Sequence, residues 1–207
     1  MPSSRFSPGL AFGLLLPVAW VGVWLLERAL APVGAAQAAY FLGMKILVWV
    51  APALVLVRRA GATLHPERLG ASLAWGLTVG LLLAAGTLLV KRLAGRPLFS
   101  TQPSWALVNM VVVAPITEEI AHRGAVLPAL TERVRPWLAN GITALLFTLA
   151  HCPGWAFRGT LRASLAAPIG GALSVFLLGA LFGWVAQRSR SIVASTLVHA
   201  LGNLAYS

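Results

Sequence analysis

The segment 114–123, APITEEIAHR, places two adjacent glutamates and an arginine inside an otherwise apolar stretch. On a helix, Glu119 and Arg123 lie four residues apart with the acid on the amino-terminal side, which is the favourable order for an ion pair. Glu118 points about 100° away from Glu119 and lacks that partner. A carboxylate in this position is suited to act as a general base, although the same residues could instead form a buried ion pair that fixes helix packing.

Two further pairs of side chains follow at helical spacing. Phe147 and His151 lie four residues apart, as do His199 and Asn203, so each pair occupies one helix face. Taken alone, a histidine or an asparagine in an apolar helix more often serves in an interhelical hydrogen bond than in catalysis. Together with Glu118, the pairs supply what peptide hydrolysis requires: a base for water, an acid for the leaving amine and donors for the oxyanion.

Composition indicates what kind of elements must hold these side chains. Of the 207 residues, 58% are hydrophobic and 10% are charged, which excludes an ordinary soluble domain. Apolar segments of about 20 residues cross a hydrocarbon layer about 30 Å thick. We therefore predict an all-α, polytopic membrane helix bundle of about seven transmembrane helices, with about six to eight as the range. The seven segments are 10–26, 38–57, 69–90, 105–130, 136–152, 168–187 and 191–206.

The depth of the polar residues within these segments predicts that they meet. Glu118 lies 13 residues after Trp105, and His151 lies 15 residues after Pro136. Each is therefore about 20 Å into its helix, and the two helices are antiparallel. A charged group at the bilayer centre costs at least about 2.5 kcal/mol, which makes such residues functional by default. Lys45, midway along the second segment, could neutralise Glu118, hold a substrate carboxylate or extend to the membrane surface.

The strong positive charge fits a lipid partner. Sixteen Lys and Arg residues oppose five Glu and no Asp, giving a net charge of +11. The cations are isolated or paired at the ends of apolar segments and form no basic stripe, which argues against nucleic-acid binding. With Lys45 and Arg123 set aside, eight lie on the amino-terminal side and six on the other, favouring a cytoplasmic amino terminus. We expect one multi-pass domain, residues 1–207, in a bacterial cytoplasmic membrane.

Three polar motifs follow one another along the apolar segments: Glu118-Glu119-x-x-x-Arg123, Phe147-x-x-x-His151 and His199-x-x-x-Asn203. This ordered trio resembles the three motifs of the CPBP (CAAX protease and bacteriocin-processing, or Abi) family of glutamic-type intramembrane proteases. The resemblance covers roughly residues 104–207, which we expect to form the catalytic core. It leaves residues 1–103 as three accessory transmembrane helices.

The resemblance implies a helical bundle around a hydrophilic chamber, related to the endopeptidases that remove the last three residues from prenylated CAAX proteins. Glu118 and His151 match the pair taken to activate water in that family. His199 and Asn203 match its oxyanion hole. Four further residues are expected to support the site: Glu119, His122, Arg123 and Phe147. Of these, His122 is expected either to contact and orient a catalytic residue or to serve only in packing.

The same residues bear on the cofactor and the substrate. Two histidines and a glutamate are a plausible zinc set, but residues 118–123 read Glu-Glu-x-x-x-Arg rather than His-Glu-x-x-His, and asparagine is a poor zinc ligand. We therefore predict a metal-independent protease without a cofactor, with zinc as the alternative. Its partner would be a membrane-anchored protein or peptide, cut near the carboxy terminus by CAAX-type or sorting-type processing.

Two other functions fit the same residues. A proton-coupled membrane transporter or relay would pass protons through Glu118 and His122 and would break no bond. A non-catalytic immunity scaffold would keep the polar residues only for packing. Glu118-dependent proton flux without cleavage would favour the relay, whereas loss of stability without loss of activity would favour the scaffold.

Overall fold

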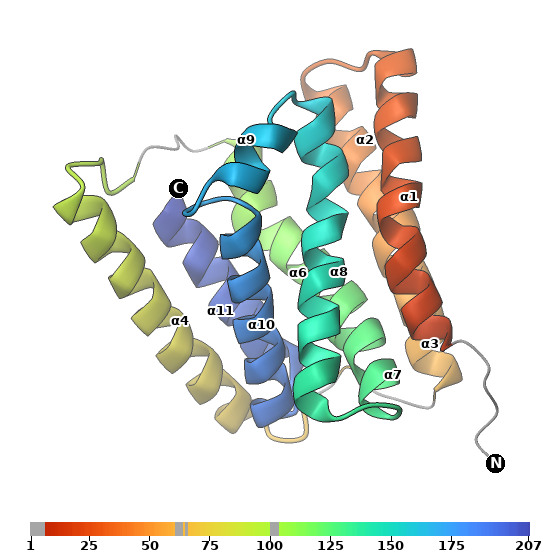
Figure 1. Cartoon of the computed structure of the whole chain (residues 1–207), viewed down its shortest axis with the longest axis vertical. Coiled ribbons are helices and arrows are strands. Elements are labelled where there is room, and N and C mark those ends of the chain that lie inside the picture. Colours follow the sequence, from red (N-terminus) through yellow and green to blue (C-terminus); the bar gives the residue numbers. More distant parts are fainter. Residues whose placement is uncertain (1–6, 61–63, 65, 100–103) are drawn as a thin grey trace.

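The computed structural model describes residues 7–60, 64, 66–99 and 104–207. Every regular element in this part of the chain is a helix, which confirms the all-α prediction (Figure 1). The α-helices are α1 (Pro8–Leu30), α2 (Ala35–Lys45), α3 (Ala51–Arg59), α4 (Leu69–Leu93), α5 (Trp105–Val108), α6 (Ala114–Glu119), α7 (Leu127–Thr131), α8 (Pro136–Phe157), α9 (Leu161–Ala166), α10 (Ala172–Ser189) and α11 (Ile192–Tyr206). Three π-helical segments join some of them: η1 (Ile46–Val50), η2 (Asn109–Val113) and η3 (Ile120–Val126).

Several of these helices are consecutive parts of longer rods. α2, η1 and α3 form one continuous helical run, and α5, η2, α6, η3 and α7 form another. A π-helical segment has main-chain bonds between residues five apart, and such segments often occur at functional sites. Pro115 lies in the first turn of α6, directly after η2. Because proline cannot donate to the carbonyl four residues earlier, the π-helical geometry of η2 accommodates it without ending the rod.

Among the residues that the structure describes, four helical runs are long and apolar enough to cross a membrane: Pro8–Leu30, Ala35–Arg59, Leu69–Leu93 and Ala172–Ser189. Large apolar side chains on them, such as Leu15, Val18 and Leu82, point outward and are mostly exposed. Lipid is the surrounding that covers an apolar outer surface of this kind. The chain is therefore an integral membrane protein, while the count of seven membrane-spanning helices stays a prediction.

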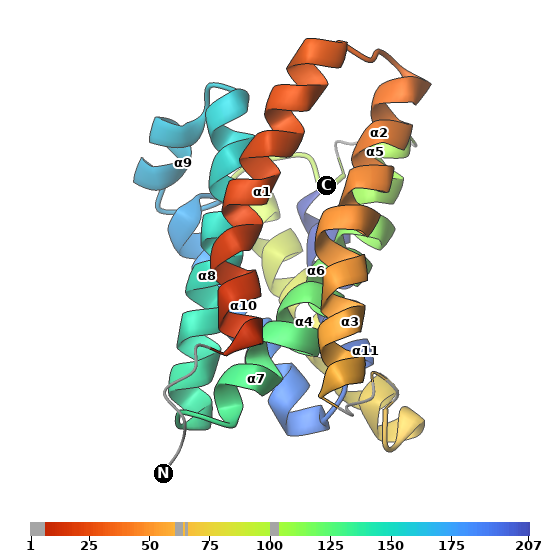
Figure 2. The same ribbon diagram turned by 90° about the vertical axis from the view of Figure 1, so that its right-hand side faces the viewer.

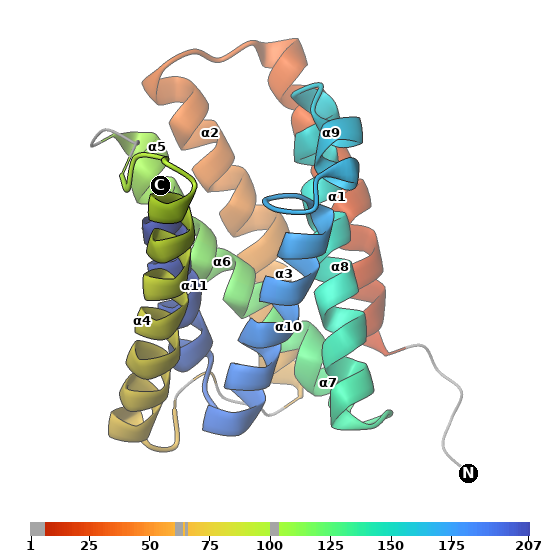
Figure 3. The same ribbon diagram turned by 60° about the vertical axis from the view of Figure 1, so that its left-hand side comes forward.

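The rod that contains α6 crosses the interior of the bundle. α6 and η3 contact α1, α3, α8, α11 and η1, which lie around them in Figures 2 and 3. α8 packs against α1 and α10, and α11 packs against α4 and α10. In Figure 1, α1 begins at the lower end of the bundle, whereas α1 and α8 both end at the upper end. The segment with the two glutamates is thus enclosed by helices from both halves of the chain.

Glycines allow α4 to approach α11 closely. A Cβ atom on Gly76 would lie 2.9 Å from the side chain of Leu197, and one on Gly80 would lie 2.7 Å from that of Leu201. Small residues let helix backbones pack tightly in a membrane, where lipid removes most of the hydrophobic force between helices. This contact seats α11, which carries His199 and Asn203, against α4.

Candidate active site

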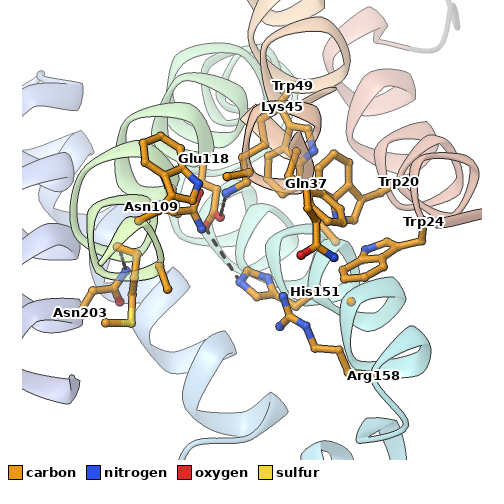
Figure 4. A pocket seen from close by; sticks show the side chains of 18 of the residues that line it. Trp20, Trp24, Gln37, Lys45, Trp49, Asn109, Glu118, His151, Arg158 and Asn203 are labelled. Atoms are coloured by element: carbon orange, nitrogen blue, oxygen red, sulfur yellow. Dashed lines mark hydrogen bonds and ion pairs between the residues drawn. The ribbon is translucent and has the colours of Figure 1, made fainter. Parts of the chain in front are cut away.

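Three of the four predicted catalytic side chains meet at one point in the bundle. Nε2 of His151 on α8 and Nε2 of His199 on α11 each lie 3.9 Å from Oε2 of Glu118, near the end of α6. Figure 4 shows Glu118 and His151 facing each other across this gap. A separation of 3.9 Å is too long for a direct hydrogen bond but suits a bridging water. The three side chains therefore frame a position for one water beside a carboxylate.

The ring of His151 is oriented by its own helix. Its Nδ1 lies 2.8 Å from the main-chain oxygen of Phe147, one turn earlier. Because a carbonyl oxygen only accepts, Nδ1 carries the hydrogen, and a neutral ring presents the lone pair of Nε2 toward Glu118. His151 is thereby prepared to accept a hydrogen bond from a water that also contacts the carboxylate.

The ring of His199 is oriented by the second glutamate. Its Nδ1 lies 3.2 Å from Oε1 of Glu119, and the ring stacks on Phe182 with centroids 4.5 Å apart. A carboxylate accepts, so Nδ1 donates to Glu119. It follows that Nε2 of His199 can donate toward the cavity only when the ring is an imidazolium with both nitrogens protonated.

Glu119 forms the predicted ion pair, and the pair is sealed from solvent. Oε1 of Glu119 accepts from Nη1 of Arg123 at 3.0 Å, and neither side chain is exposed. Arg123 also donates from Nη2 to the main-chain oxygen of Gly179 on α10. Through these bonds and the one from His199, Glu119 ties together the rod that contains α6, helix α10 and helix α11.

Phe147 occupies the space between the polar side chains of the site. Its ring centroid lies 5.1 Å from that of His122, 4.7 Å from that of His151 and 6.0 Å from that of His199. The guanidinium carbon of Arg123 lies 4.7 Å from the same centroid, which is a cation–π contact. An aromatic side chain at this position keeps the imidazoles apart and shields the Glu119–Arg123 pair from the cavity.

His122 is fully buried and contacts the ring of Phe147. Its Nδ1 lies 3.0 Å from the main-chain oxygen of Glu118, and its ring makes edge contacts with Trp49 and Phe147. Among the described residues, its Nε2 has no hydrogen-bond partner. His122 therefore packs against Trp49 and Phe147, and its supporting role in the site stays a prediction.

Lys45 reaches the site from α2. Its Nζ lies 3.2 Å from Oε1 of Glu118, and the two residues are 8% and 7% exposed. Of the three roles that the sequence leaves open for this lysine, the structure shows the first, neutralisation of Glu118. The position of Lys45 in the middle of an apolar segment is the sequence feature that indicates a role for this lysine.

A cavity of about 840 Å³ contains the site, and Figure 4 shows side chains that line it. Its wall includes Gly34, between α1 and α2, and Arg158, directly after α8, so it extends to the end of the bundle where α1 and α8 end. Polar residues on its wall are Gln37, Lys45, Asn109, Glu118, His151, Arg158, His199 and Asn203. Aromatic residues on its wall are Trp20, Trp24, Phe41, Trp49, Trp105 and Trp155. This aromatic lining is absent from the residues predicted for the site, although Trp20 and Trp24 lie one turn apart on one helix face and are a sequence signal for it.

Asn203, the fourth predicted catalytic residue, lines the same cavity but bonds a group other than the three side chains above. Its Nδ2 donates to the main-chain oxygen of Met110 on η2 at 2.8 Å. Within the described part of the chain, the structure does not bond this side chain to Glu118, His151 or His199. A primary amide has a second N–H, so the bond to Met110 leaves one donor for a ligand.

The donor set does not fit zinc well. Glu118, His151 and His199 are the side chains that such an ion would use, yet the Lys45 ammonium already bonds the Glu118 carboxylate. Within residues 7–60, 64, 66–99 and 104–207, no group of three His, Cys, Asp or Glu side chains is arranged to hold a metal ion.

Comparison with known proteins adds one match to this geometry. A family model described as Type II CAAX prenyl endopeptidase Rce1-like matches residues 100–205, just over half of the chain. No curated protein and no solved structure matches the chain. The matched range contains all three polar motifs and begins after the four helices α1 to α4.

Proposed function

The chain belongs to the Rce1-like family of type II CAAX prenyl endopeptidases, and from that premise we propose that it hydrolyses a peptide bond near the carboxy terminus of a membrane-anchored protein. The observation that carries the proposal is the convergence of Glu118, His151 and His199 on one position in a cavity inside a membrane protein. Family membership gives the class of reaction, and this geometry supports the assignment of roles.

Glu118 is the proposed general base. A water in the gap donates one hydrogen to Oε2 of Glu118 and the other to Nε2 of His151, so its lone pair points at the scissile carbonyl carbon. Glu118 takes the proton as the oxygen–carbon bond forms. When the carbon–nitrogen bond breaks, the same proton passes from Glu118 to the leaving amine, which completes the hydrolysis without net change in the protein.

His199 and Asn203 are the proposed donors to the oxyanion. His199 can donate from Nε2 when both ring nitrogens carry a hydrogen, with Nδ1 bonded to Glu119. Asn203 contributes the amide N–H that Met110 does not use. Donors in a water-poor site are effective because they are already oriented when the negative charge develops.

The mechanism needs no metal, and the substrate is a membrane-tethered protein in a bacterial cytoplasmic membrane. Cleavage is of the CAAX type or of a sorting type that trims a carboxy-terminal membrane tail. The aromatic wall of the cavity suits the apolar residues that end such segments. Among the two, a transmembrane tail is favoured because no loop of the sequence indicates prenyl recognition.

This proposal is tested in two strains, one with the wild-type chain and one with Glu118→Gln. The carboxy termini of all membrane-anchored proteins are compared between the two strains. Glu118→Gln is nearly isosteric and cannot take a proton, so the termini of substrates should remain unprocessed in its presence. Identical termini in both strains, with both proteins present at equal levels, would refute a protease role. Proton flux that depends on Glu118 in proteoliposomes, without any cleavage, would support the relay instead.

A further inference from the structure

We propose that Lys45, from the part of the chain that precedes the family match, is a positioning residue of the active site. It holds one oxygen of Glu118 so that the other faces the reacting water. The inference rests on the proposed function, because it assigns to Lys45 a part in the same reaction.

The two oxygens of Glu118 have different partners. Lys45 bonds Oε1 at 3.2 Å, whereas the imidazoles of His151 and His199 both face Oε2 at 3.9 Å. A carboxylate without a fixed partner can rotate and present either oxygen. The bond to Lys45 selects one orientation, and the selected orientation is the one in which a water between Oε2 and the imidazoles is activated.

The remaining charges near Glu118 do not replace Lys45. The nearest other cation in sequence, Arg123, pairs with Glu119 and donates its other amino group to Gly179. Each of the two buried carboxylates thus has its own cation, one from the same helical rod and one from α2. An uncompensated charge at this depth would be costly, so Lys45 is specific for Glu118.

The local structure around Lys45 holds its side chain in place. Lys45 is the last residue of α2, directly before the π-helical segment η1. Its ammonium lies 5.8 Å from the ring centroid of Trp49, and Trp49 makes an edge contact with Trp20 at 5.4 Å. The Glu118 side of the pair is likewise flanked by π-helical segments, η2 and η3. Such irregular segments often mark functional sites, and here one adjoins Lys45 and two flank the short helix that carries Glu118.

A positioning role and a purely neutralising role of Lys45 predict different effects when the lysine is replaced. A neutralising lysine is needed for folding and insertion but leaves the rate constant of the folded protein unchanged when it is lost. A positioning lysine governs the rate at which bound substrate is cleaved, and it leaves substrate affinity unchanged because it bonds Glu118 rather than the peptide.

Kinetics of Lys45→Met, Lys45→Arg and a matched control separate the two roles. The probe is a peptide spanning a cleavage site whose processing in cells depends on Glu118, presented to the purified full-length chain in lipid nanodiscs. Lys45→Met should lower kcat about 100-fold, since a small misplacement of a reacting group has effects of that size. KM should change less than about threefold, and Lys45→Arg should recover kcat to within about tenfold of wild type.

Arg59→Met is the control, because it removes an exposed cation at the end of the same membrane-crossing run. It should leave kcat and KM unchanged. If Lys45→Met fails to accumulate as folded protein, Lys45→Gln takes its place, since its amide is polar but uncharged, and the same loss of kcat is expected. A wild-type kcat in the folded Met or Gln variant, or a loss confined to KM, overturns the proposal.

Failure of this inference differs from failure of the proposed function. If no carboxy terminus depends on Glu118, the protease role is refuted and the role of Lys45 falls with it. If a Glu118-dependent cleavage exists and the Lys45 variants catalyse it at the wild-type rate, only the role of Lys45 is refuted.

Discussion

Glu118 and Glu119 are neighbours in the chain but lie in two different environments, which we call the open side and the closed side of the site. On the open side, Glu118 is held at one oxygen by Lys45 and faces the cavity and His151 with the other. On the closed side, Glu119 is fully buried and bonded by Arg123 and His199. A carboxylate with a free oxygen at a cavity can do chemistry, whereas one enclosed by cations and rings holds helices together.

His199 belongs to both sides and connects them. Its Nδ1 bonds Glu119 at 3.2 Å, and its Nε2 lies 3.9 Å from Glu118. The closed side therefore determines where a group of the open side points. If this division is right, variants of the two glutamates should fail in different ways.

The largest expected effect is the loss of kcat caused by Glu118→Gln. Loss of a general base should lower kcat by about 10²- to 10⁴-fold. The thermal melting temperature in detergent should fall far less than for Glu119→Gln, because the Lys45 ammonium left unpaired lines the cavity, whereas Arg123 is fully enclosed. Measured cleavage of a substrate peptide and a melting curve check both statements. An active Glu118→Gln beside an inactive but stable Glu119→Gln would reverse the assignment of the two sides.

Glu119→Gln should act mainly on stability. It leaves Arg123 charged, unexposed and without its carboxylate, a change that typically costs about 3–5 kcal/mol. The exposed ion pair between Glu67 and Arg190, 3.5 Å apart, provides the matched control. Glu67→Gln should change the unfolding free energy by less than about 1 kcal/mol. Equal melting temperatures for the two variants would show that the closed side is not structural.

A smaller effect on the open side is expected from Asn203→Ala. Removing one oxyanion donor should lower kcat about 10²- to 10³-fold, with KM nearly unchanged. The variant also loses the bond to the main-chain oxygen of Met110, so its melting temperature must be measured beside its rate. A lower melting temperature together with a wild-type rate constant would place Asn203 among the structural residues.

The smallest expected effect is that of metal removal. With Lys45 bonded to Glu118, no step of the proposed reaction requires zinc. Dialysis of the purified protein against EDTA and 1,10-phenanthroline should therefore leave the cleavage rate unchanged. A loss that added zinc restores would move the open side to metal chemistry and would require Lys45 to leave Glu118.

Contacts within one helix were the most predictable part of the site. Spacing of four residues placed Glu119 beside Arg123 and Phe147 beside His151, because helix geometry alone fixes such neighbours. The distance of each residue from the start of its helix also predicted that Glu118 and His151 meet, since two antiparallel helices that cross the same layer share a midplane. The all-α bundle followed from hydropathy for a similar reason.

Contacts between helices were harder to predict. The sequence suggested that Lys45 could reach Glu118 but not that it would, because the rotation of α2 about its axis depends on packing by Trp20 and Trp49. The bond from His199 to Glu119 and the bond from Asn203 to Met110 depend likewise on how α11 is seated. The π-helical segments have no residue signature that periodicity detects.

The direction in which the cavity extends has a topological consequence. Its wall includes Gly34 before α2 and Arg158 after α8, at the end of the bundle opposite to the start of α1 (Figure 1). In the proposed reaction, the tail peptide would leave toward the side of the membrane opposite to the start of α1. With the start of α1 on the cytoplasmic side, the product would be released on the external face, and with the opposite orientation it would be released into the cell.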